Sequence, residues 1–160
     1  MNIAHHLHDL LHNVALWATL FAWMAAQLIK LATHIVRTRT FDFGFLLRLG
    51  GMPSSHTAAS TAGAVCIGCA AGFDSPTFAV AAGLVSLIVI DAQSVRYAAG
   101  EQARLLNQMA ADFYRDHKIS PKKLVEFLGH TRLEVFAGFL LGLAIAIATQ
   151  LWLAPWIRSL

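Results

Sequence analysis

The sequence predicts an all-α integral membrane protein, a single membrane domain of residues 1–160 with about four transmembrane helices and one interfacial amphipathic helix. Hydrophobic residues make up 57% of the chain and charged residues only 13%, whereas a soluble domain has about 25% charged residues. The apolar residues also gather in four long stretches. Because a helix needs about 20 apolar residues to cross a bilayer, each stretch is a candidate span.

The predicted spans are Val14–Val36, Ser55–Phe73, Thr77–Val95 and Leu133–Trp156. No Lys or Arg precedes the first stretch, and it is longer than the apolar region of a secretory signal peptide. We therefore expect it to be retained as the first span. Too little sequence remains outside the four spans for a second globular domain.

Lys and Arg residues near the span ends fall almost entirely on one side of the predicted bundle. The loops on that side carry Arg37, Arg39, Arg48, Arg96, Arg104, Arg115, Lys118, Lys122, Lys123 and Arg132. The opposite side has only Arg158. Since basic loops are retained in the cytoplasm, we expect both termini to face out. The net charge of +3 then suits anionic membrane lipids and not nucleic acid.

The second basic loop, residues 96–129, begins with an amphipathic pattern. Apolar residues recur at helical spacing from Val95 to Phe113, opposite charged residues that include Arg96 and Glu101. This pattern predicts a helix that lies in the membrane interface.

Four ionisable residues, Lys30, His56, Asp91 and His130, each fall at or near the end of a different apolar stretch. In an up-and-down bundle these four residues gather on one face, the basic side. Ionisable groups in membrane segments are costly and usually functional. They are therefore the first candidates for a site.

Two stripes of residues at i+4 spacing begin at the histidines and continue in small residues. They are His56, Ser60, Ala64, Gly68 and Gly72 in the second span, and His130, Glu134, Gly138, Gly142 and Ala146 in the fourth. Small residues allow close helix approach. We expect the two stripes to pack together and to bring His56 towards His130.

The residue types around the histidines indicate phosphoryl transfer. Glu134, one turn after His130, can accept a hydrogen bond from one ring nitrogen and raise the basicity of the other. A turn before His56 leads into a helix start at Ser54 and Ser55, where backbone amides can bind an anion. Lys30 and Arg96 add positive charge for phosphoryl oxygens. One histidine then serves as nucleophile and the other as general acid.

At these residues the chain resembles the type 2 phosphatidic acid phosphatase superfamily, which is related to vanadium-dependent haloperoxidases, and in particular its divergent bacterial and plant branch. The resemblance runs from about Ala25 to Gly142. Its strongest segments are Gly50-Gly51-Met52-Pro53-Ser54-Ser55-His56-Thr57, Asp91-Ala92-Gln93-Ser94-Val95-Arg96 with Ala99-Gly100-Glu101-Gln102, and Leu128-Gly129-His130-Thr131-Arg132-Leu133-Glu134-Val135.

The resemblance implies a helical-bundle phosphatase core and a role for each matching residue. Lys30 and Arg37 keep the seven-residue spacing of the first motif, although Thr38 stands where a Pro is expected. The second motif, Pro-Ser-Gly-His, ends in the general acid, which is His56 here. The third contains the nucleophile, His130, with Glu134 in place of Asp.

The chain differs from the superfamily pattern in one motif residue and in its number of predicted spans. The third motif has an Arg six residues before its His, where this chain has Leu124. We expect Arg96 to take the role of that Arg, and Asp91 to orient either Arg96 or a histidine. Four spans stand where membrane members commonly have six, which is compatible with a minimal core, a homodimer or both.

We therefore expect a metal-independent phosphatase of the bacterial inner membrane, with its active site towards the cytoplasm and no cofactor. It would hydrolyse a phosphate monoester or pyrophosphate, with a lipid phosphate as substrate, through a phosphohistidine. The alternatives are a non-enzymatic scaffold or transporter with an anion-binding pocket, and a vanadate-dependent oxidase. Loss of activity with EDTA would favour a metal-assisted mechanism using Asp91 and Glu101.

A separate cluster, His5, His6, His8, Asp9 and His12, lies at the N-terminus. His8 and His12 are spaced one helical turn apart and could ligate a metal. A flexible, solvated N-terminus is the interpretation that we favour for this segment.

Overall fold

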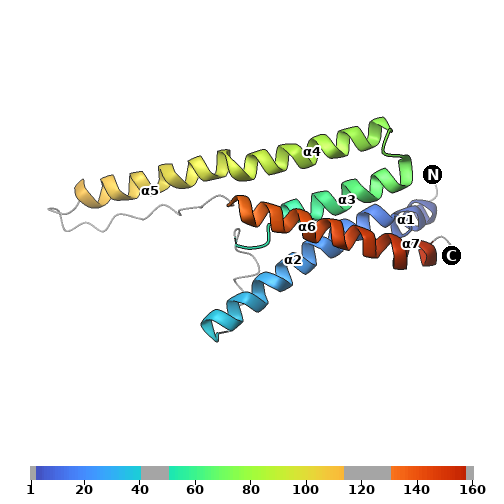
Figure 1. The fold of residues 1–160 in the computed structure, drawn as a ribbon, viewed down its shortest axis with the longest axis horizontal. Helices are drawn as coiled ribbons and strands as arrows, with labels where there is room; N and C mark the ends of the chain where they lie inside the picture. The colour runs from blue at the N-terminus through green and yellow to red at the C-terminus, as the bar shows by residue number, and fades with distance from the viewer. Residues whose placement is uncertain (1–2, 41–50, 114–130, 158–160) are drawn as a thin grey trace.

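A computed structural model describes residues 3–40, 51–113 and 131–157 of the chain. All regular elements within these ranges are helical. In chain order they are α1 (Ile3–Leu11), α2 (Val14–Thr38), α3 (Ser55–Ala71), α4 (Pro76–Gln93), α5 (Val95–Phe113), α6 (Arg132–Ala148), the π-helical turn η2 (Thr149–Leu153) and α7 (Ala154–Ile157). The prediction of an all-α membrane protein is confirmed (Figure 1).

Three helical stretches are long and apolar enough to cross a membrane: Val14–Thr38, Pro76–Ala111 and Arg132–Ile157. The second predicted span, Ser55–Phe73, corresponds to α3, which has only 17 residues. At 1.5 Å per residue a helix of that length covers about 25 Å, less than the ~30 Å hydrocarbon core of a bilayer. Three of the predicted spans are therefore matched by helices long enough to cross a bilayer, and the second predicted span is a shorter helix inside the bundle.

Helix α3 is the centre of the bundle and packs against α2, α4 and α6. Figure 1 shows α3 between α4 on one side and α2 and α6 on the other. The core consists of small residues from three helices: Ala18, Ala22 and Ala26 of α2, Ala58, Ala62 and Cys66 of α3, and Ala146 of α6. Small side chains let helices approach closely, which is how helices associate where lipid removes the hydrophobic driving force.

The contact between α3 and α6 uses the predicted glycine stripe of α6 but not the predicted face of α3. A Cβ at Gly138 would lie 2.5 Å from the backbone oxygen of Ser54, and one at Gly142 would collide with the backbone of Ala58. On α3, Gly68 instead faces the rings of Phe73 and Phe78. The prediction that the two histidine-led stripes pack together is therefore wrong.

Helix α5 follows α4 directly in the chain. Figure 1 shows it continuing the direction of α4 and projecting beyond the bundle. No Gly or Pro interrupts the junction, and backbone hydrogen bonds from Ser94 to Ile90 and from Ala98 to Ser94 bridge it at 2.9 Å each. The helix therefore runs on from α4 without a break, and its placement in the membrane interface stays a prediction.

Both ends of the described chain lie at the same end of the bundle, and the starts of α3 and α6 lie towards the other (Figure 1). This agrees with the predicted arrangement of both termini on one side and both basic loops on the other. Which side faces the cytoplasm remains a prediction.

Candidate active site

Lys30 is the most deeply buried charged residue among the described helices, with 4% of its surface exposed. It lies on α2, and its Nζ donates a hydrogen bond to Oγ of Ser55, the first residue of α3, at 3.2 Å. The negative charge of Glu134 on α6 also stabilises the charged ammonium of Lys30. A buried ammonium needs such partners, because an isolated charge in a low-dielectric interior is very costly.

The start of α3 is a buried, hydrogen-bonded turn. Gly51 has a φ of 83°, a conformation that favours glycine. Ser54 is the N-cap, and its Oγ accepts hydrogen bonds from the backbone amide of Thr57 at 3.4 Å and from its Oγ1 at 3.0 Å. Ser54, Ser55 and Thr57 are all buried. This helix start is therefore held firmly in place beside Lys30.

Helix α6 begins with a capping box at Thr131 and Glu134. The backbone amide of Thr131 donates to Oε2 of Glu134 at 2.8 Å, and the amide of Glu134 donates to Oγ1 of Thr131 at 3.3 Å. The backbone amide of Ser54 donates to the carbonyl oxygen of Glu134 at 2.9 Å. The second and third predicted motifs are thus joined directly at the starts of their helices.

A cavity of about 570 Å³ lies beside this junction. Its lining comes from three parts of the chain: Ile29, Lys30, Thr33, His34 and Arg37 of α2, Gly51, Met52 and Pro53 before α3, and Ala137 and Leu141 of α6. Ligand pockets usually measure about 300–1,000 Å³ and combine an apolar lining with few polar groups. The cavity has this character, with two cations among apolar side chains.

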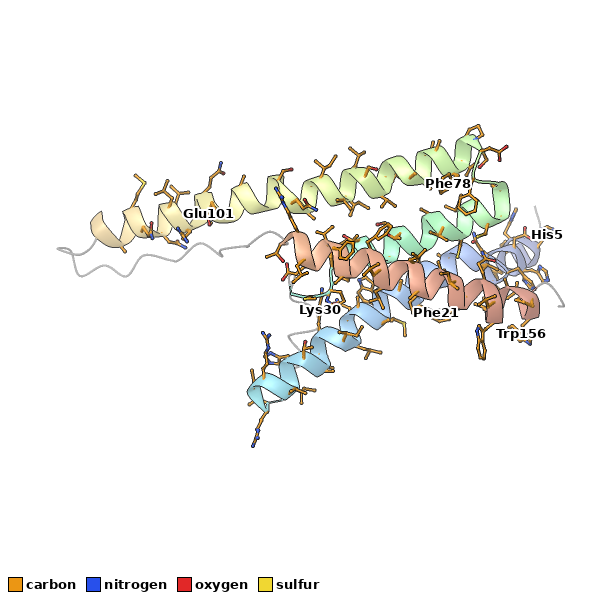
Figure 2. All side chains as sticks on the ribbon, in the orientation of Figure 1. His5, Phe21, Lys30, Phe78, Glu101 and Trp156 are labelled. Atoms are coloured by element: carbon orange, nitrogen blue, oxygen red, sulfur yellow. The ribbon has the colours of Figure 1, made fainter. Side chains whose placement is uncertain are left out.

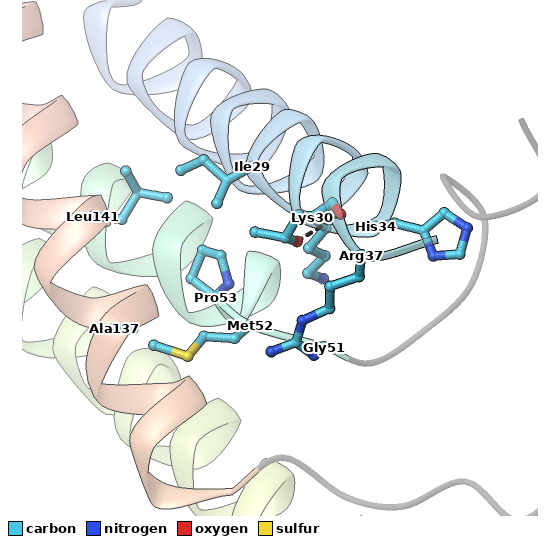
Figure 3. A pocket seen from close by; sticks show the side chains of 10 residues that line it. Ile29, Lys30, His34, Arg37, Gly51, Met52, Pro53, Ala137 and Leu141 are labelled. Atoms are coloured by element: carbon cyan, nitrogen blue, oxygen red, sulfur yellow. Dashed lines mark hydrogen bonds between the residues drawn. The ribbon is translucent and has the colours of Figure 1, made fainter. Parts of the chain in front are cut away.

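Figure 3 shows how the cations are placed in the cavity. Lys30 and Arg37 lie on the side of α2 that faces Met52 and Pro53, whereas the ring of His34 points away from them. The predicted first-motif pair therefore shares one cavity with the segment that leads into the second motif. This cavity brings together Lys30, Arg37 and Gly51–Pro53, and Lys30 links it to Ser55 at the start of α3.

Other predicted site residues are not gathered at the cavity in the described structure. The side chain of His56 is exposed on α3, and Asp91 is partly exposed on α4. Glu101 lies on α5, where it pairs with Arg104 at 3.7 Å, and Figure 2 places it well away from Lys30. His130 and the side chain of Arg96 lie outside the described residues.

The backbone amides near Ser54 are less available than predicted. The amide of Ser54 is bonded to Glu134 and that of Thr57 to the side chain of Ser54. Ser54 therefore serves as a helix cap and as a link to α6. The Thr131 cap was missed, although the Thr-x-x-Glu pattern is readable as a capping box.

Residues 11–145, most of the chain, match the family described as the divergent PAP2 family. The chain belongs to the divergent PAP2 family. It is also similar to "Uncharacterized membrane protein YuiD" of Bacillus subtilis (strain 168), with 38% identity over 150 residues, 87% of this chain and 95% of the relative. No solved structure matches it significantly. The resemblance predicted from the motifs is confirmed, and the protein is a membrane protein of a phosphatase-related family.

Proposed function

We propose that this member of the divergent PAP2 family is a metal-independent phosphatase that hydrolyses a phosphate monoester or pyrophosphate, with a lipid phosphate as substrate. The observation that carries the proposal is the shared cavity. Lys30 and Arg37 line one largely apolar space together with Gly51–Pro53, which lead into α3, and Lys30 is hydrogen-bonded to Ser55 at the start of that helix. Two cations suit phosphoryl oxygens, and apolar walls suit the hydrocarbon part of a lipid.

The proposed first step forms a bond between a ring nitrogen of His130 and phosphorus, while the bond from phosphorus to the leaving oxygen breaks. His56 donates a proton to that oxygen. In the second step a water oxygen attacks phosphorus, His56 takes the proton of the water, and the phosphorus–nitrogen bond breaks. Inorganic phosphate leaves and both histidines return to their starting states.

Lys30 and Arg37 would hold the phosphoryl oxygens through both steps, with Arg96 as a further predicted contact and Asp91 as its support. Glu134 would steady the positive charge that develops on His130. Its Oε2 accepts from the Thr131 amide, but a carboxylate has two oxygens and about four acceptor positions. Capping α6 and orienting His130 are therefore compatible.

A second candidate is an anion-binding membrane protein without turnover, which keeps the cavity as a phosphate or headgroup site. Two observations favour it. The side chain of His56 is exposed, and Leu124 stands at the position of the third-motif Arg. This candidate predicts phosphate binding without release of inorganic phosphate.

The test is a panel of lipid phosphates and lipid pyrophosphates offered to the purified protein in detergent, with release of inorganic phosphate as the readout. We expect release with at least one substrate, inhibition by vanadate, no effect of EDTA, and no release by His130→Ala. Lipid phosphate binding without any release would favour the second candidate. Loss of turnover with EDTA would support the metal-assisted mechanism through Asp91 and Glu101.

A further inference from the structure

The N-terminal histidines lie on a helix and not on an irregular segment. Residues Ile3–Leu11 form α1, and the side chains described on it are exposed to solvent, as predicted. Figure 2 places His5 at the end of the bundle far from Glu101 and separate from Lys30. Any chemistry of this helix is therefore independent of the cavity described above.

Three side chains of α1 present metal-ligand atoms to one point in space. His5 and Asp9 are one turn apart, and Nδ1 of His5 lies 3.0 Å from Oδ2 of Asp9. His6 follows His5 directly, and the two rings meet edge to face, with centroids 6.2 Å apart. One ligand atom from each of His5, His6 and Asp9 lies within 4.8 Å of the other two.

We propose that His5, His6 and Asp9 form a binding site for a divalent transition metal ion of the zinc class. Imidazole and carboxylate are the ligands that such ions take, and three protein ligands with water in the fourth position make a common tetrahedral site. Bonds of ~2.0–2.2 Å place neighbouring ligand atoms about 3.3 Å apart. The His5–Asp9 pair is already near that separation, and exposed side chains can close the remainder by rotation.

His8 and His12 have the same four-residue spacing as His5 and Asp9, but their side chains are arranged differently. The rings of His8 and His12 are stacked, with centroids 3.8 Å apart and planes 18° from parallel. Nδ1 of His12 donates a hydrogen bond to the backbone oxygen of His8 at 2.7 Å. Stacked rings do not direct two nitrogens at one ion. Nδ1 of His8 lies 4.0 Å from Oδ1 of Asp9, but His8 is not part of the cluster formed by His5, His6 and Asp9. As another exposed histidine on α1, His8 is the control for the proposed site.

Metal binding would also stabilise α1 itself. A helix of nine residues is marginal in isolation, because nucleation is unfavourable and few hydrogen bonds follow it. An ion that joins residues one turn apart binds the helical form and not the extended one, so binding energy becomes folding energy. The metal would thus order the segment that enters α2.

The test is a titration of the full chain with Zn²⁺ in detergent, purified without a polyhistidine tag and followed by calorimetry. We expect one zinc ion per chain in the wild type. His5→Ala and Asp9→Ala should each weaken binding by about tenfold or more, the loss of one ligand, and His8→Ala should bind as the wild type does. Zinc should also slow amide hydrogen exchange in residues 3–11 of the wild type.

Two results would overturn the proposal. One is a wild type that binds no more zinc than His5→Ala does. The other is an equal loss in His8→Ala and His5→Ala, which would indicate diffuse adsorption to several histidines. Phosphate release in the presence of EDTA is a separate readout, so failure of the metal site and failure of the proposed phosphatase are distinguishable.

Discussion

Nζ of Lys30 donates a hydrogen bond to the hydroxyl of Ser55 at 3.2 Å and so joins the middle of α2 to the first residue of α3. Ser55 stands where the Pro-Ser-Gly-His motif of the superfamily has Gly, which offers no side-chain acceptor. An ammonium has three donor hydrogens. One is directed to Ser55, which holds the charge of Lys30 at the wall of the cavity.

Replacing Lys30 with Met should abolish most of the phosphatase activity while leaving the fold intact. Met keeps much of the side-chain volume, and exchanging a buried ion for an apolar residue is often neutral for stability. We expect kcat/KM to fall by about 100-fold or more, as when one transition-state contact is removed. Phosphate release and the thermal unfolding midpoint in detergent are the measurements. An unchanged kcat/KM would remove Lys30 from the site.

Arg37 and Arg39 form a matched pair, since they are close in sequence but only Arg37 lines the cavity. Arg37→Gln should weaken binding of vanadate by about tenfold, because a charge-assisted hydrogen bond contributes about 1.5–3 kcal/mol. Arg39→Gln should leave it unchanged. Equal effects in the two variants would mean that the arginines act only through long-range charge.

Gly138 should tolerate no side chain, whereas Gly83 should. A Cβ at Gly138 would meet the backbone oxygen of Ser54 at 2.5 Å, but nothing lies within 4 Å of one at Gly83. Overpacking typically costs about 1–3 kcal/mol, and replacing Gly by Ala within a helix gains about 0.5–1 kcal/mol. Gly138→Ala should therefore lower the unfolding midpoint and Gly83→Ala should not. A Gly138→Ala protein as stable as the wild type would contradict the close packing of α3 and α6.

Glu134→Gln separates the two roles of Glu134. Gln also completes a capping box, so the free energy of unfolding should change little. The charge that would stabilise a positively charged His130 is lost, so we expect kcat to fall by about tenfold or more. Thr131→Ala is the complementary variant and should cost about 1 kcal/mol of stability through loss of the cap. Full activity in Glu134→Gln would restrict Glu134 to capping.

The sequence predicted the helices that are defined by long apolar stretches. The predicted span Leu133–Trp156 matches the run from α6 to α7, Arg132–Ile157, closely. The start of this run is set by the capping residues Thr131 and Glu134, which are local in sequence. Local signals of this kind need no knowledge of the neighbouring helices.

The packed face of α3 could not be predicted in the same way. This helix carries small residues on all sides, including Ala58 and Ala62 as well as Ala64 and Gly68. Periodicity of small residues therefore does not select one face. The choice depends on how α2, α4 and α6 cross α3, which is a property of the whole bundle. This is why His56 was expected at the α6 contact and is exposed instead.

The cavity was predicted only in part. The first family motif paired Lys30 with Arg37, and the predicted phosphate contacts joined Lys30 to the helix start at Ser54 and Ser55. The contribution of Ala137 and Leu141 depends on where α6 passes. The direction of α5 likewise depends on whether the helix bends after Gln93, and amphipathicity indicates a polar face but not a bend.

The proposed hydrolase binds phosphate in the cavity beside Lys30 and forms a phosphohistidine at position 130. The most direct test of this mechanism is to mix the purified protein with an activated phosphate ester, quench rapidly under alkaline conditions and locate the phosphorylated residue by mass spectrometry. We expect phosphate on His130 in the wild type, more of it in His56→Ala because hydrolysis is slowed, and none in His130→Ala. Turnover of the ester with no phosphate on His130, or equal turnover in His130→Ala, would contradict the claim.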